Sequence, residues 1–477
     1  MFLKQYPKAI PYLFMTEMWE RFSYYGITAV LILYMSKTFS MDNEQVYAIY
    51  GAYGALVYMT PLVGGWLADN YLGRVATVIM GGVFIAAGQF IVSMPSTELS
   101  VFYYGLAVVI VGTGLFIPNI NAIVGELYEA NDPGRENGFT LAYMGRNIGT
   151  ILAPIIASEV AALYNWRLAF AVAGCGMLLG LVIFLIGLRQ YNARSFSASI
   201  TPSLVAKVAI FSALLSGLVF LFMAHNQLVG PLLISVVIGM SLYFIGFACK
   251  EETLQRDKIF AAMTLTAFYI VFLILLQQSG GALNLFTDRF VDRTAFGFTI
   301  ETGMFQSIEP LALIMLAPFY NRLWTSLAEK KRSVSDGTKF VGALALMSSS
   351  FVLMAFAMHF TNGNGLISMH WINLTYVLQA AGELFIGPIG LAMVSRLIPS
   401  KVVGLYMGFW VLATAVANFI AAKIGAYITP VANLSGHVSQ QLAIHSYQVA
   451  FFELSVLGFT SVVLLALLVP KLNRLIR

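Results

Sequence analysis

Long hydrophobic runs separated by short polar segments dominate the pattern of this 477-residue chain. A helix needs about 20 mostly apolar residues to cross a bilayer. We place about fourteen such runs, near 12–36, 46–69, 74–94, 101–122, 138–163, 167–189, 203–223, 229–248, 259–282, 300–323, 338–359, 367–394, 402–427 and 446–470. The pattern therefore predicts an all-α membrane protein with fourteen transmembrane helices.

The order of these spans indicates three parts. We expect a six-helix bundle over 1–190, a two-helix insertion with its linkers over 191–255 and a second six-helix bundle over 256–477. A weak internal repeat supports the two bundles, since the second span of each half contains a proline, Pro61 and Pro310, at a matching position. Repeated halves with matching breaks inside their helices are typical of transporters that bind a solute near the bilayer midplane.

Composition and charge support this prediction. The chain is 59% hydrophobic and 10% charged, with a mean hydropathy of +0.81, whereas soluble domains carry roughly 25% charged residues. Most of the 27 lysines and arginines fall on the side of the N-terminus, which the positive-inside rule assigns to the cytoplasm for both termini. This basic excess orients the protein and does not indicate nucleic-acid binding. The two cysteines and five histidines form no spaced ligand cluster, so we expect no metal and no cofactor.

The first span carries an unusual set of ionisable residues. Glu17, Glu20, Arg21, Tyr24 and Thr28 are spaced so that they share one helical stripe. Charges at membrane depth cost several kcal/mol unless they face the bundle interior and pair. Two acids beside one arginine give a net negative cluster, so at least one carboxylate is expected to bind a proton reversibly. The alternative is an ion pair that only packs helices.

Four segments give the chain a family resemblance. Residues 17–26 read Glu-x-x-Glu-Arg-Phe-x-Tyr-Tyr-Gly, which resembles the first-helix signature of the proton-dependent oligopeptide transporters. Residues 65–74, 382–391 and 408–415 are similar to the loop between spans two and three, the tenth helix and the eleventh helix. The resemblance implies a major facilitator fold with the two-helix insertion of bacterial members. It also implies a monomer in the bacterial inner membrane that moves a small peptide or peptide-like solute together with protons by alternating access.

The resemblance also implies roles for single residues. The expected proton-coupling set is Glu17, Glu20 and Arg21. The expected pocket of the N-terminal half contains Tyr24, Tyr25, Tyr58 and Asn147, although packing is as good an explanation of the three tyrosines. In the C-terminal half, Glu383 is expected to bind the substrate's amino terminus, and Trp410 to pack against it. Asp69 and Arg74 are expected to form a gate.

Four positions depart from the family pattern. Ile117 replaces a lysine, Arg146 replaces an isoleucine, Glu309 replaces an asparagine, and Gln277 before Gln278 replaces a glutamate. The total charge is kept while its distribution changes.

We expect Arg146, Gln278 and Glu309 to line the pocket. A guanidinium suits a carboxylate better than an ammonium does, and a second acid beside Glu383 would favour a solute with an extra positive group, such as a Lys- or Arg-containing dipeptide. The alternative is that Arg146 and Glu309 pair with each other or with the gating residues.

Other interpretations stay open. Glu126 begins a charged loop, 126–136, that we expect to be a solvated face, and 288–293 could form an outer gate. An exchanger or exporter of small amphiphiles is the nearest alternative function, and a channel is a weaker one. A membrane enzyme would need a nucleophile, base or metal at the membrane surface, whereas the strongly placed ionisable groups here lie in mid-span. We therefore expect no enzyme activity.

Overall fold

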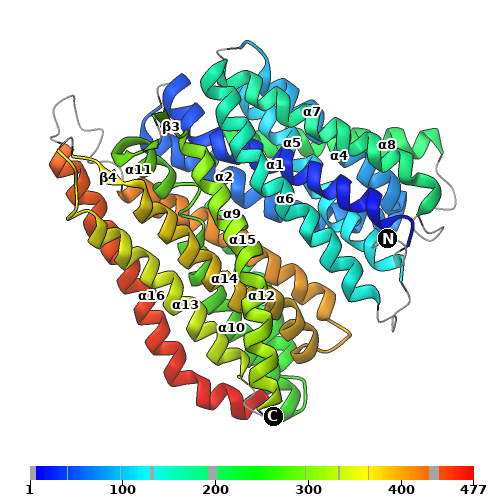
Figure 1. Cartoon of the computed structure of the whole chain (residues 1–477). Coiled ribbons are helices and arrows are strands. Elements are labelled where there is room, and N and C mark those ends of the chain that lie inside the picture. Colours follow the sequence, from blue (N-terminus) through cyan, green and yellow to red (C-terminus); the bar gives the residue numbers. More distant parts are fainter. Residues whose placement is uncertain are drawn as a thin grey trace. The chain divides into compact units, whose positions relative to one another are not determined.

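A computed structural model of the chain describes residues 7–39, 41–96, 98–128, 134–191, 201–295, 297–330, 334–363, 365–428 and 440–476. Contacts between Cα atoms divide it into two compact units (Figure 1). Unit 1 comprises Met1–Ser40 and Ala52–Val229, and unit 2 comprises Met41–Gly51 and Gly230–Arg477. The two helices of the predicted insertion fall in different units.

Helices make up almost all of the described chain. In chain order they are α1 (Ile10–Thr38), α2 (Asn43–Met59), α3 (Pro61–Leu67), the π-helix η2 (Ala68–Leu72), α4 (Arg74–Ser93), α5 (Leu99–Glu126), α6 (Gly134–Leu163), α7 (Trp166–Ile186), the 3₁₀-helix η3 (Gly187–Gln190), α8 (Pro202–Ala224), the 3₁₀-helix η5 (Asn226–Leu228), α9 (Val229–Ala248), α10 (Thr253–Leu276), α11 (Ala282–Phe290), the 3₁₀-helix η6 (Thr302–Ser307), α12 (Ile308–Glu329), α13 (Asp336–Ala357), α14 (Met369–Leu397), α15 (Val403–Ile428) and α16 (Gln440–Ile476). Four two-residue strands, which the hydrophobic pattern did not predict, form two small ladders: β1 (Val291–Asp292) pairs in parallel with β4 (Ile367–Ser368), and β2 (Thr294–Ala295) pairs antiparallel with β3 (Phe298–Thr299).

The predicted spans coincide with long helices. Within the described residues, twelve helical segments are long and apolar enough to cross a membrane. Helices α1 and α12, of 29 and 22 residues, are the other two predicted spans, and they carry the ionisable residues Glu17, Glu20, Arg21 and Glu309.

The predicted start of one span, 300–323, is wrong. The β2–β3 ladder and η6 precede α12, which begins at Ile308. The Arg293 guanidinium donates to the carbonyl oxygen of Ile300 at 2.9 Å and holds this segment outside the helix.

Close packing of α6 on α1 positions the polar residues of unit 1. A Cβ atom added at Gly145 would lie 2.6 Å from the carbonyl oxygen of Phe14, and one at Gly149 would collide with the carbonyl oxygen of Met18. Small residues are favoured where membrane helices approach closely. Because these glycines flank Arg146 on α6, the contact brings its side chain to the turn of α1 that contains Glu17.

A small apolar cluster joins α12 and α14 in unit 2. Ala312 and Leu313 of α12 pack with Ala380 of α14. The cluster lies about one helical turn from Glu309 on α12 and from Glu383 on α14, so it fixes these two helices beside the acidic residues.

The α1–α6 contact yields a stability prediction. We expect Gly145→Ala to destabilise the protein by about 1–3 kcal/mol, because backbone atoms must move to admit the new methyl group. Thermal unfolding in detergent measures the loss. Gly217→Ala on α8 is the control, since no atom lies within 4 Å of its added Cβ atom. Equal melting temperatures for the two variants would contradict the packing argument.

Candidate functional site

The first ion pair of unit 1 lies within α1. Arg21 donates to Glu20 through Nε at 2.6 Å and through Nη2 at 3.0 Å. Glu20 is 3% exposed, and the pair therefore lies inside the bundle rather than on its surface. The two-point geometry matches the planar guanidinium to the carboxylate and holds both side chains in one orientation.

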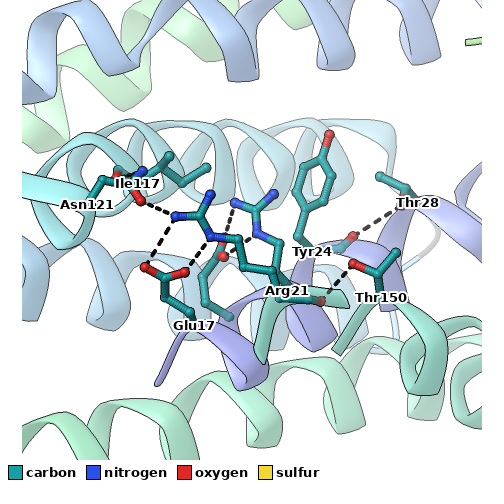
Figure 2. Close-up of polar contacts among 9 residues, drawn as sticks. Glu17, Arg21, Tyr24, Thr28, Ile117, Asn121 and Thr150 are labelled. Carbon is teal, nitrogen blue, oxygen red and sulfur yellow. Dashed lines mark hydrogen bonds and ion pairs between the residues drawn. The ribbon is translucent and has the colours of Figure 1, made fainter. Parts of the chain in front are cut away.

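The second ion pair joins α6 to α1. Arg146 donates to Glu17 through both Nε and Nη2, and Glu17 is 1% exposed (Figure 2). The net negative cluster expected on α1 is therefore wrong, because Arg146 adds the second positive charge. The four side chains Glu17, Glu20, Arg21 and Arg146 form a formally neutral set.

Asn121 of α5 is a member of this set that the sequence analysis missed. Its Oδ1 atom accepts a hydrogen bond from Arg146 Nη2, and its Nδ2 atom donates to the carbonyl oxygen of Ile117 at 3.0 Å (Figure 2). Asn121 follows Ile117 by one helical turn, so Arg146 brings a cation to the part of α5 where the family resemblance implies a lysine. The available signal was an amide four residues from the departure, a spacing that puts Asn121 and Ile117 on one face of the helix.

The aromatic residues expected in the pocket surround Arg21. Its guanidinium lies 5.3 Å from the centre of the Tyr24 ring, and the Tyr24 and Tyr25 rings meet edge to face at 5.1 Å. Arg21 also interacts electrostatically with Tyr25 and Tyr58. Asn147, which is 8% exposed, donates from Nδ2 to the Tyr143 carbonyl oxygen of its own helix at 2.9 Å.

The acidic residues of unit 2 form a pair. The carboxyl groups of Glu309 on α12 and Glu383 on α14 interact with each other. Two ionised carboxylates in one site repel each other, so the pair favours a proton or a cation between them. Tyr376 of α14 interacts electrostatically with Glu309, and its hydroxyl donates to the Ser279 carbonyl oxygen at 3.3 Å.

Gln278 and Trp410 make other contacts within unit 2. Gln278 is 1% exposed, and its Nε2 atom donates to the Ala421 carbonyl oxygen at 3.2 Å, while its Oε1 atom has no hydrogen-bond partner among the described residues. Trp410 stacks on Tyr269 with ring centres 4.2 Å apart. Their expected contacts with substrate stay predictions.

Arg74, one of the two residues expected to form a gate, has a partner that was not predicted. Arg74 forms an ion pair with Glu126 at the end of α5, and it lies 3.5 Å from Asp69. The expectation of a solvated face is therefore wrong for Glu126, because the end of α5 packs close to the start of α4. Residues 129–133 of that loop lie outside the described residues. In the segment 288–293, Arg293 lies 3.8 Å from Asp288.

The described residues contain no group of three or more His, Cys, Asp or Glu side chains that could hold a metal ion. The chemistry that they do contain is a set of buried carboxylates and guanidinium groups in membrane-spanning helices. Such groups mark ion and substrate pathways in membrane proteins, which places the chain in the class of membrane transporters.

Comparisons with known proteins define the family. Residues 75–440 match the model of the POT family. The chain is 30% identical over 472 residues to the dipeptide and tripeptide permease A of Serratia proteamaculans (strain 568), covering 98% of this chain and 92% of the permease. It is 33% identical over 436 residues to the transporter YclF of Bacillus subtilis (strain 168), covering 88% and 87%. A crystal structure of a POT peptide transporter with sulfate superposes with a TM-score of 0.85 at 30% identity, covering 99% and 96%. The chain belongs to the POT family.

The Arg74 contacts predict unequal effects at its two acidic partners. Glu126→Gln should cost about 1 kcal/mol of stability, whereas Asp69→Asn, whose side chain is 62% exposed, should cost less than about 0.5 kcal/mol. Thermal unfolding of the two variants beside the wild type measures the difference. A larger loss in Asp69→Asn would show that Arg74 depends on Asp69 instead.

Proposed function

We propose that the protein is a proton-coupled symporter of di- and tripeptides, working by alternating access. Its membrane would be a bacterial inner membrane, with both termini in the cytoplasm. The observation that carries the proposal is the pair of buried ion pairs, Glu20–Arg21 and Glu17–Arg146, in membrane-spanning helices. The dipeptide and tripeptide permeases among the relatives supply the substrate class.

Proton uptake would act on the ion pairs. A carboxylate that gains a proton loses its charge, so its arginine loses most of the attraction that held it. Glu20 and Glu17 each hold one arginine, and protonation of either would free a guanidinium inside the bundle. This links the proton to a new arrangement of charge, which is what a symporter requires.

Arg146 is the proposed partner of the substrate carboxylate. Its side chain is 32% exposed, and its Nη1 atom makes no hydrogen bond within the described part of the chain. A guanidinium presents several donors in one plane, so an edge stays available while Glu17 and Asn121 occupy the others.

The Glu309–Glu383 pair is the proposed partner of the substrate ammonium. An ammonium can bind between the two carboxyl groups and reduce their repulsion, and the second carboxylate can then interact with another positive group. This supports a preference for Lys- or Arg-containing peptides.

Asp69, Arg74 and Glu126 are proposed to hold the ends of their helices during the conformational cycle.

The alternatives lack a comparable observation. An exporter of small amphiphiles would not need an acidic pair able to bind an ammonium group. A membrane enzyme would need a reactive group, and the relatives named in the comparisons are transporters. We therefore propose no catalytic activity.

Glu20→Gln tests the coupling. The amide cannot take up and release a proton, so proteoliposomes with this variant should lose accumulation of labelled dialanine driven by a pH gradient while keeping counterflow exchange. Glu159→Gln is the control, because it makes the same change at an exposed position of α6. Accumulation against a gradient by Glu20→Gln would contradict the assignment.

Glu383→Ala tests the ammonium site. Removing one partner of a buried charge pair costs about 2–5 kcal/mol, so the affinity for dialanine should fall by tens-fold or more. Binding of N-acetyl-dialanine, which has no ammonium group, should change little. Glu329→Ala at the exposed end of α12 serves as the control. A normal affinity for dialanine in Glu383→Ala would refute the assignment.

A further inference from the structure

The amide group of Asn121 is oriented by its own helix. Its Nδ2 atom donates to the Ile117 carbonyl oxygen at 3.0 Å. Because that bond commits the nitrogen, the Oδ1 atom is left to accept, and it accepts from Arg146 Nη2. Asn418 on α15 makes the same bond within its helix, from Nδ2 to the Thr414 carbonyl oxygen at 2.9 Å, without an arginine partner among the described residues.

Arg146 has two partners of different character. Glu17 accepts from Nε and Nη2, and Asn121 accepts from Nη2 alone. Glu17 is a charged acceptor on α1, and Asn121 is a neutral acceptor on a different helix, α5. Asn121 therefore fixes the Nη2 end of the guanidinium from a second direction.

We propose that Asn121 is a positioning residue that keeps the Arg146 guanidinium directed at the substrate carboxylate, and that it thereby determines selectivity for peptides with a free C-terminus. The proposal rests on the proposed function, because it takes a peptide carboxylate as the ligand of Arg146. An arginine side chain has about 2 kcal/mol of rotamer entropy, and a fixed acceptor reduces the number of orientations it samples.

The surroundings leave Asn121 without a charged competitor on its own helix near Arg146. Glu126, the one charged residue of α5, pairs with Arg74. Helix α7, which also packs on α1, carries its one charged residue, Arg167, in the first turn. Among the described residues, the recorded charged partners of Arg146 are Glu17 and Glu20 of α1, and Glu20 also pairs with Arg21.

Transport kinetics with two probes test the proposal. We expect Asn121→Ala to raise the KM for dialanine about tenfold with kcat nearly unchanged, because a hydrogen bond to a charged group contributes about 1.5–3 kcal/mol. The KM for dialanine amide, which lacks the carboxylate, should not change. Asn121→Asp has the same shape but adds a negative charge that competes for Arg146, so it should raise the KM for dialanine further. Asn418→Ala is the matched control and should leave the ratio of the two KM values as in the wild type.

A double-mutant cycle without ligand separates this proposal from the proposed function. In thermal unfolding, Asn121→Ala and Arg146→Gln should be non-additive, since each removes the same contact. Additive losses, or equal KM increases for dialanine and dialanine amide, would overturn the positioning role. If the wild type transported no dipeptide, the proposed function would fail, and additivity in the cycle would decide whether Asn121 positions Arg146.

Discussion

The need to neutralise charge inside membrane-spanning helices governs unit 1. An ionised side chain at membrane depth is costly unless it is paired and hydrogen-bonded. Each acid of α1 meets this requirement with one arginine. Glu20 pairs with Arg21 of the same helix, and Glu17 pairs with Arg146 of α6. Gly145 and Gly149 let α6 lie against the backbone of α1, where Arg146 reaches Glu17. The close packing of the two helices and the neutralisation of Glu17 therefore depend on the same contact.

Unit 2 solves the same problem in a different way. Glu309 and Glu383 interact with each other, and neither forms an ion pair with a lysine or arginine among the described residues. An acidic pair without a cation from the protein is the property on which the proposed ammonium site depends.

The sequence predicted features that depend on local spacing. Hydrophobic runs located the long helices, and the i, i+3, i+4 spacing placed Glu17, Glu20 and Arg21 on one stripe, where Glu20 and Arg21 do pair. It did not predict the ion pairs Arg146–Glu17 and Arg74–Glu126, because contacts between helices depend on the rotation and depth of each helix. The start of α12 was missed for a similar reason, since the Arg293 contact that keeps Ile300 outside the helix is a tertiary one.

The departures from the family pattern are easier to understand as a set than one at a time. The family resemblance implies a lysine at the position of Ile117 on α5, and in this chain Arg146 of α6 provides a cation near that position. The exchange is not neutral in geometry, because a lysine is a point charge with rotating donors while an arginine is a planar fork. The guanidinium contacts Glu17 through Nε and Nη2 and contacts Asn121 through Nη2. The ammonium group of a lysine could make such hydrogen bonds only with a weaker preference for direction. With the cation on α6, an acceptor on α5 limits the orientations of the guanidinium, and Asn121, one turn from Ile117, is such an acceptor.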